Sequence, residues 1–113
     1  MNKAETQRKR NNNARLFDWN STRHVNCVRL SVGNSLRHEI AKIGVCYQLQ
    51  KMGHEFLTEA KTKNRSGRVD IVDLDDGMIY EVVESEKKQS ILEKGKRYPL
   101  PIIVVSIPKE VKK

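Results

Sequence analysis

Two acidic residues flank a turn in the middle of the chain and are the first candidates for chemistry. Asp70 lies in the β-branched run 68–74, and Glu81 lies in the run 78–83. The Asp76-Gly77 step between these runs is typical of a two-residue hairpin turn. Because side chains alternate along a strand, the hairpin predicts that Asp70 and Glu81 emerge on one face. Two carboxylates on one face are suitable ligands for a hard cation such as Mg²⁺.

The turn also fixes the expected register, in which Asp75 pairs with Met78 and Asp70 pairs with Val83. The opposite face of the hairpin is then expected to carry Val69, Ile71, Tyr80 and Val82. A one-residue bulge would bring Glu84 to the site in place of Glu81. The other acids of this segment are expected to face water: Asp73, Asp75 and Asp76.

The clearest helix covers residues 35–52 and ends at Gly53. Its apolar residues recur at spacings of three and four: Leu36, Ile40, Ile43, Cys46 and Tyr47, followed by Leu49 and Met52. Glu39 falls inside this stripe, where a buried unpaired carboxylate is costly. Three interpretations stay open: its head reaches water, it pairs with Lys42, or it points toward the hairpin acids and helps to hold a metal.

The remaining elements follow from composition and periodicity. Residues 1–15 are polar and basic without apolar periodicity, which predicts a flexible arm before a single domain at 16–113. Further predicted elements are a short strand or extended lead-in at 28–32, an edge strand at 54–60, a helix at 84–97 and a buried parallel strand at 102–107. The order is helix, strand, hairpin, helix, strand, with a right-handed crossover before the last strand.

Charge indicates an anionic partner. The 113 residues include 22 Lys and Arg against 14 acids, for a net charge of +8. Nucleic acid is the usual partner of such a surplus, and the candidate contacts are Arg8, Lys9 and Arg10 in the arm and Lys61, Lys63, Arg65 and Arg68 in the basic loop. The alternatives are a solubilising arm and an exposed connection.

Cysteine usage and hydropathy point to a reducing, cytosolic environment. Cys27 and Cys46 do not make a secreted disulfide framework, and Cys46 is expected to be a buried thiol. His24 and Cys27 have a ligand-like spacing, but no second pair completes a zinc site. No apolar run is long enough for a membrane span, so no membrane partner is expected.

The order of elements, with Glu39, Asp70 and Glu81 in place, resembles the PD-(D/E)XK nuclease superfamily over residues 33–108. Within it, the chain is most similar to archaeal Holliday-junction resolvases and small archaeal or viral relatives. Val69-Asp70 stands where the family has Pro-Asp, and Glu81-Val82-Val83 stands where it has (Asp/Glu)-x-Lys. The resemblance implies an α/β fold with a restriction-endonuclease-like αβββαβ core, a mixed sheet flanked by helices.

The same resemblance implies a metal-dependent deoxyribonuclease that hydrolyses DNA phosphodiesters, and its resolvase-like relatives suggest that it selects branched DNA structures. Glu39, Asp70 and Glu81 would be catalytic around Mg²⁺ or Mn²⁺, with the backbone carbonyl of Val82 in the metal shell. The protein would act on DNA as a homodimer in the cytoplasm of a prokaryotic or virus-infected cell.

The chain departs from the family at Val83, which replaces a lysine that orients water or stabilises phosphate charge. Three interpretations follow. A lysine from elsewhere takes its place, with Lys61, Lys63 and Lys87 as candidates; a shifted register brings in Glu84 or Glu86; or the domain binds nucleic acid without cutting it. A separate possibility is an interaction subunit that recruits a partner through residues 16–19 or a strand edge.

Overall fold

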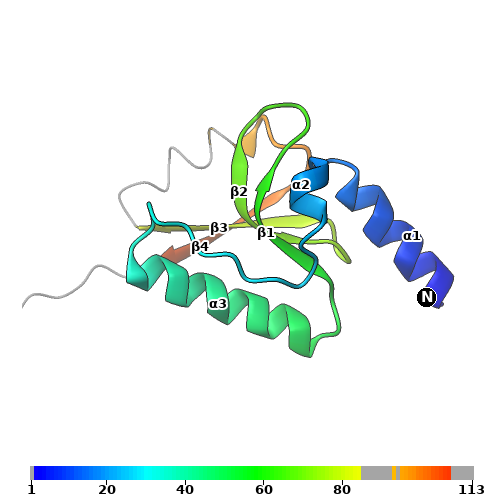
Figure 1. Ribbon diagram of the computed structural model, residues 1–113, viewed down its shortest axis with the longest axis horizontal. Helices are drawn as coiled ribbons and strands as arrows, with labels where there is room; N and C mark the ends of the chain where they lie inside the picture. The colour runs from blue at the N-terminus through cyan, green and yellow to red at the C-terminus, as the bar shows by residue number, and fades with distance from the viewer. Residues whose placement is uncertain (1, 85–92, 94, 108–113) are drawn as a thin grey trace, which may run out of the picture.

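The computed structural model describes residues 2–84, 93 and 95–107. Its helices are α1 (Lys3–Ala14), α2 (Trp19–Thr22) and α3 (Leu36–Lys51), and its strands are β1 (Phe56–Lys61), β2 (Arg68–Asp73), β3 (Met78–Glu84) and β4 (Ile102–Ile107). The sheet order is β1-β2-β3-β4, with β4 parallel to β3 and the other pairs antiparallel. This mixed sheet with flanking helices (Figure 1) confirms the α/β class and is compatible with the predicted αβββαβ core.

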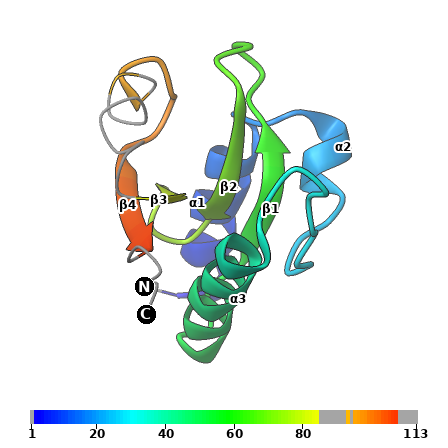
Figure 2. The ribbon, with the colours of Figure 1, turned by 90° about the vertical axis from the view of Figure 1, so that its left-hand side faces the viewer.

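Two apolar clusters pack on opposite faces of the sheet. Cys46 and Leu49 of α3 pack on Phe56 and Ile71. The second cluster consists of Phe17, Leu57, Ala60, Val69, Val72, Leu74 and Ile79. Figure 2 shows α3 on one side of the sheet and α1 on the other. The chain therefore has a small core in two layers, and α3 is the helix that covers the sheet near the predicted acids.

The segment expected to be a flexible arm is the helix α1. Asn2 caps its first turn by accepting a hydrogen bond from the Glu5 N–H, at 2.8 Å. The helix buries no residue, so apolar periodicity gave no signal for it. Polar contacts hold it instead: Arg10 pairs with Asp75, and the Asn13 amide donates to the Leu74 carbonyl at 2.7 Å. The structure therefore differs from the expected flexible arm: residues 3–14 form a helix that is docked by polar side chains and by Ala14 against the core cluster.

The outward face of α3 is a second correction. Its bounds, with Ser35 as the N-cap and Gly53 at φ +77° beyond its end, agree with the prediction. Most of the predicted apolar stripe, however, is exposed: Leu36, Ile40, Ile43, Tyr47 and Met52. The buried residues are Glu39, Lys42, Cys46 and Leu49. The helix is rotated from the expected orientation because ion pairs satisfy Glu39 and Lys42 in the interior.

The β2–β3 hairpin has a longer loop than predicted. Asp73 pairs with Met78, so four residues make the connection instead of two. The Asp73 carboxylate accepts hydrogen bonds from the N–H groups of Asp75 and Asp76, at 2.9 and 3.2 Å, and this stabilises the wider turn. Asp73 is consequently fully buried rather than exposed. The register shifts by two residues, which preserves the alternation that relates Asp70 to Glu81.

Two further expectations changed. Strand β4 is parallel as predicted, but it lies at the edge of the described sheet and only Ile107 in it is buried. Residues 27–31 form no strand; they run beside β1, where the Thr58 hydroxyl donates to the Cys27 carbonyl and accepts from the Arg29 N–H. Of the predicted helix 84–97, the structure describes only Glu93 and Gly95 as helical, and most of it lies outside the described residues.

Candidate functional site

The sheet loses its regular alternation at Glu59 and Asp70. Val69 and Ile71 lie two residues apart on β2, yet they pack in different clusters on opposite faces of the sheet. Opposite them on β1, Glu59 has φ +49°, a conformation that residues with side chains rarely adopt. Strand distortions of this kind re-aim side chains and are common beside active sites. Here the distortion accompanies two carboxylates that both contact α3.

Short contacts join the three acids expected at the site. His38 lies between two of them, with Nδ1 3.3 Å from Glu39 Oε1 and Nε2 3.3 Å from Asp70 Oδ2. The Asp70 N–H donates to Glu81 Oε1 at 3.4 Å, and the Val82 N–H donates to Asp70 Oδ2 at 2.8 Å. Glu39, Asp70 and Glu81, from one helix and two strands, are therefore linked through the His38 ring and the Asp70 N–H, while their role as a shared site stays a prediction.

Lys42 is fully buried beside these acids. Its Nζ lies 2.8 Å from Glu39 Oε2 and 3.3 Å from Glu59 Oε2, and it donates to the Arg29 carbonyl at 2.7 Å. Burial alone would raise the pKa of Glu39, but the adjacent Lys42 ammonium and a hydrogen bond from Asn34 more than offset this, so the pKa of Glu39 is lowered. Glu39 is therefore an anion at neutral pH despite being buried.

Negative charge at the site also acts on Tyr98. Burial, followed by the carboxylates of Glu81 and Asp70, raises the pKa of Tyr98 to about 12. Its phenol therefore stays protonated at neutral pH and remains able to donate a hydrogen bond.

Sequence reasoning missed His38 and Glu59 and considered Lys42 only as a partner for Glu39. The i,i+3 spacing of Glu39 and Lys42 was a usable signal for an ion pair on one helix. His38 adjoins Glu39 in sequence, but nothing in the apolar pattern placed its ring against β2. Glu59 gave no signal, because its positive φ has no recognisable sequence pattern.

The residue types present suit a hard divalent cation, but the ligand atoms of Glu39, Asp70 and Glu81 do not all lie within 4.8 Å of one another, so side chains must move to share one ion. Three carboxylates supply the oxygen ligands that Mg²⁺ and Mn²⁺ prefer. Glu39 Oε2 is buried and accepts no hydrogen bond of normal geometry, although the Lys42 ammonium lies close to it. The His38 ring lies between Glu39 and Asp70, so a cation shared by both acids requires this ring to move aside or to become a ligand. The role of the Val82 carbonyl as a ligand stays a prediction.

The position at which the nucleases it resembles carry a lysine is apolar in this chain. Val83 is 4% exposed and pairs with Ser106 of β4. Among the suggested substitutes, Lys61 and Lys63 are exposed at the end of β1 and in the loop that follows. Lys87, Glu86 and the side chain of Glu84 lie outside what the structure describes. Lys42 is instead the lysine that the structure places against the acids.

The basic residues expected to hold nucleic acid divide into two groups. Arg8 and Lys9 are exposed on α1, whereas Arg10 is engaged by Asp75, Glu55 and the Gly53 carbonyl. Four others are exposed around the loop after β1: Lys61, Lys63, Arg65 and Arg68. Arg10 is therefore a structural residue, and the loop remains the better candidate for phosphate contact.

Two adjoining hollows lie beside this loop. The first, of about 550 Å³, is lined by His24, Arg29, Glu59, Lys61 and Arg68 among others. The second, of about 580 Å³, shares Lys61 and Arg68 and adds Lys63 and Arg65. Glu59 belongs to the first hollow and also contacts Lys42. Glu59 is therefore the residue that connects the basic hollows to Lys42 and its neighbouring acids. Glu39, Asp70 and Glu81 do not line either hollow.

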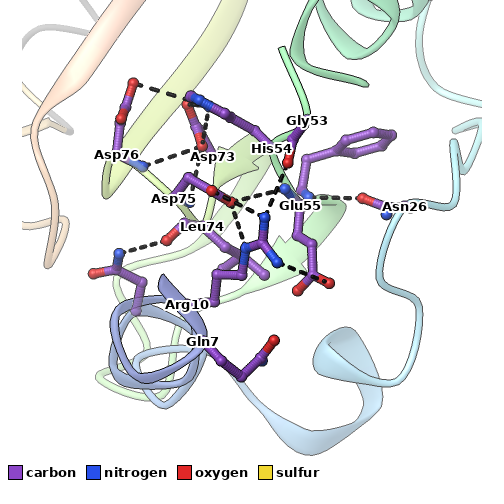
Figure 3. A network of polar contacts seen from close by, with 12 residues as sticks. Gln7, Arg10, Asn26, Gly53, His54, Glu55, Asp73, Leu74, Asp75 and Asp76 are labelled. Atoms are coloured by element: carbon purple, nitrogen blue, oxygen red, sulfur yellow. Dashed lines mark hydrogen bonds and ion pairs between the residues drawn. The ribbon is translucent and has the colours of Figure 1, made fainter. Parts of the chain in front are cut away.

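A second polar group lies at the other end of β2. Ligand atoms of His54, Asp73 and Asp76 come within 4.8 Å of one another, a property that no other such group has in the described part of the chain. Figure 3 shows why this group has a structural explanation: His54 Nδ1 lies 3.0 Å from Asp73 Oδ2, and Asp73 Oδ1 already accepts N–H groups of the turn. Burial alone would lower the pKa of His54, but the hydrogen bond and the negative charge of Asp73 raise it overall.

Comparison with known proteins adds no assignment. No protein-family model, no curated protein and no solved structure matches the chain. Within the described residues, no helix has the length and apolar character needed to cross a bilayer.

Proposed function

We propose that the protein is a metal-dependent deoxyribonuclease. The observation that carries this proposal is the contact path from Glu39 through His38 to Asp70 and on to Glu81. Acids from three separate elements meet there, next to a surface rich in lysine and arginine. A simple salt bridge needs one acid and one base, whereas here Lys42 contacts Glu39 and Glu59, His38 contacts Glu39 and Asp70, and Glu81 accepts from the Asp70 N–H.

In this proposal each residue has a distinct role. Asp70 and Glu81 hold the cation, and Glu39 completes or orients its ligand shell. A divalent cation bound there would activate water and neutralise charge that develops on a phosphodiester. Lys42 keeps Glu39 ionised, because the pKa of Glu39 is lowered by that contact. Arg68 and Lys61, at the mouth of the adjoining hollows, bind the phosphate backbone without reading sequence.

The test is cleavage of a four-way DNA junction and of linear duplex with Mg²⁺ or Mn²⁺. We expect Asp70→Asn and Glu81→Gln to abolish cleavage while DNA binding in the absence of metal persists. The matched control is Asp76→Asn, which removes a charge from the same hairpin at a side chain that is 54% exposed. Cleavage that persists unchanged in both site variants rejects the proposal.

One observation favours a second candidate, a DNA-binding protein that does not cut. Val83 is buried where the family has its lysine, and the ammonium of Lys42 is already engaged by two carboxylates and a carbonyl. This candidate predicts binding that weakens steeply with salt and is unaffected by metal. Calorimetric titration with Mn²⁺ separates the two candidates. Only the nuclease is expected to bind Mn²⁺ and to lose that Mn²⁺ binding in the Asp70→Asn variant.

The proposal keeps the expected setting. DNA is the partner, Mg²⁺ or Mn²⁺ is the cofactor, and the cytoplasm of a prokaryotic or virus-infected cell is the location. A homodimer is expected as well, since a four-way junction presents two symmetric cleavage positions.

A further inference from the structure

A third hollow extends the basic surface toward α2. It has a volume of about 310 Å³ and is lined by Arg15, Trp19 and Lys63 among others. Lys63 also lines the second hollow described above, and that hollow shares Lys61 and Arg68 with the first. The three hollows therefore adjoin in series, and we name them together the basic groove.

The basic groove has a surplus of positive charge. Six exposed cations line it: Arg15, Arg29, Lys61, Lys63, Arg65 and Arg68. The acids in its lining, Asp18 and Glu59, both have partners inside the fold. Asp18 accepts a hydrogen bond from the Ser21 N–H at 2.8 Å, and Glu59 lies 3.3 Å from the Lys42 ammonium. The groove therefore attracts an anionic chain.

Trp19 is an exposed aromatic residue among these cations. It is 74% exposed, whereas Phe17, two positions earlier, is 1% exposed in the core. Aromatic rings beside lysine and arginine are the combination that binds unpaired nucleotides, because every base has a face that stacks on a ring and every nucleotide carries a phosphate. The third hollow contains both parts, since Trp19 and Lys63 line it together.

The backbone holds Trp19 beside the basic loop. The Asp18 N–H donates to the Lys61 carbonyl at 2.9 Å, and the Lys63 N–H donates to the Leu16 carbonyl at 2.9 Å. Figure 1 shows the result, with α2 next to the end of β1. The ring and the cations are thus in place before a ligand binds, which lowers the entropy cost of binding.

The residue types favour a nucleic acid over a protein as the occupant. Tryptophan and arginine are common in both kinds of interface, but lysine is depleted at protein–protein interfaces. Lys61 and Lys63 lie inside the groove, and each lines two of the three hollows. A duplex does not suit Trp19, because its bases stack on one another and their faces are covered. An unpaired strand leaves those faces free.

We infer that the basic groove binds single-stranded DNA, with a base stacked on the Trp19 ring and neighbouring phosphates held by Lys63 and Lys61. The inference deepens the proposed function and rests on it for the choice of DNA, since it names the form of DNA that this surface binds. An unpaired segment at a branch point would provide such a strand. Stacking and phosphate contact require no metal, so they can be measured apart from cleavage.

The first test is the binding of a fluorescein-labelled oligothymidylate of about 12 nucleotides, followed by anisotropy at low salt in EDTA. We expect Trp19→Ala to weaken binding roughly tenfold and Trp19→Phe, which keeps an aromatic face, to weaken it less. The matched control is Tyr47→Ala, because Tyr47 is 58% exposed on α3 and lines none of the three hollows. This control should bind like the unmodified chain.

Three outcomes of this test overturn the inference. They are an unmodified chain that binds no single strand, a Trp19→Ala variant that binds as tightly as the unmodified chain, and a variant that loses blunt duplex to the same extent as single strand. Tighter binding of an oligouridylate of the same length would overturn the choice of DNA.

The second test uses the emission of Trp19, which is the only tryptophan of the chain. Because a stacked base quenches indole fluorescence, we expect unlabelled oligothymidylate to quench this emission and blunt duplex to leave it nearly unchanged. Emission that is unaffected when the single strand is saturating would contradict stacking. A chain that is quenched but cuts no DNA with Mg²⁺ or Mn²⁺ keeps the inference and loses the nuclease proposal, so the two fail separately.

The third test concerns the phosphate contacts. Lys63→Gln should reduce the salt dependence of single-strand binding by about the amount of one phosphate contact. Lys51→Gln removes an exposed lysine from the end of α3 and is the control. Equal salt dependence of the two variants would overturn the contact assigned to Lys63.

Discussion

Arg10 and Asp75 form a two-point ion pair that ties the first helix to the hairpin turn. Nε lies 2.8 Å from Oδ1, and Nη2 lies 3.1 Å from Oδ2. The side chains are 19% and 14% exposed, so solvent screens the pair only partly. Since α1 has no fully buried residue, this pair and the Asn13 contact contribute to its position, together with Ala14, which packs against the core cluster. A helix that lacks an apolar face can therefore be anchored at the turn that sets the register of β2 and β3.

We expect Arg10→Ala to lower the free energy of unfolding by about 1–3 kcal/mol, because a charge-assisted pair is lost and Asp75 keeps a partly buried charge. Urea unfolding measures the change. Arg8→Ala, an exposed residue on the same helix, should leave the midpoint unchanged. Equal effects of the two substitutions would mean that the ion pair does not anchor α1.

Lys42→Met should be far more destabilising, by about 3–5 kcal/mol, because it leaves Glu39 and Glu59 buried without their counter-ion. The double variant Glu39→Gln, Lys42→Met should recover part of the loss. Denaturant unfolding of the four proteins in this cycle gives the coupling between the two residues. Additive losses would show that Glu39 and Lys42 do not depend on each other.

Stability should respond to pH through His54. Its pKa is raised above 6.5 by Asp73, so its contribution is complete below pH 6.5 and is lost as pH rises through the higher folded value. We expect the stability difference between the unmodified chain and His54→Asn to be largest below pH 6.5 and to shrink above it. His24→Asn, in the turn after α2, is the control. A difference that grows with rising pH would contradict this assignment.

The two cysteines should react very differently with a thiol reagent. Cys27 is exposed, whereas Cys46 is buried and burial raises its pKa to about 11. In the native protein we therefore expect rapid labelling of Cys27 and slow labelling of Cys46, since the thiolate is the reactive form. Mass spectrometry of labelled peptides identifies each site. In denaturant both should react at similar rates, and fast native labelling of Cys46 would contradict the packing of α3.

Local patterns in the sequence were sufficient for the sheet but not for the way α1 and α3 meet it. The hairpin was recognisable because β-branched runs flank an Asp-Gly step, and parity alone kept Asp70 and Glu81 related when the turn proved wider. The bounds of α3 followed from the spacing of its apolar residues and from Gly53. Its rotation did not, because periodicity assumes that apolar residues face inward, and here Glu39 and Lys42 are satisfied by ion pairs.

Local sequence patterns were also enough to predict part of the candidate site. They could not predict the residues that only the fold brings to it. Glu39 drew attention because a carboxylate stood inside an apolar stripe, and this conflict can be seen in the sequence alone. Glu59 and His38 raised no such conflict, and only the fold brings them beside Asp70. The docking of α1 was invisible because Arg10 and Asp75 are 65 positions apart and their types are common on any surface.

The left-handed conformation of Glu59 affects more than the aim of one carboxylate. It interrupts β1, an outer strand of the sheet, and residues 26–29 already occupy that border through the Phe56 carbonyl and the Thr58 hydroxyl. An outer strand that is both kinked and covered is a poor template for strand addition by another chain. Among the described strands, we therefore expect strand addition by another chain at β4, the other outer strand, rather than at β1.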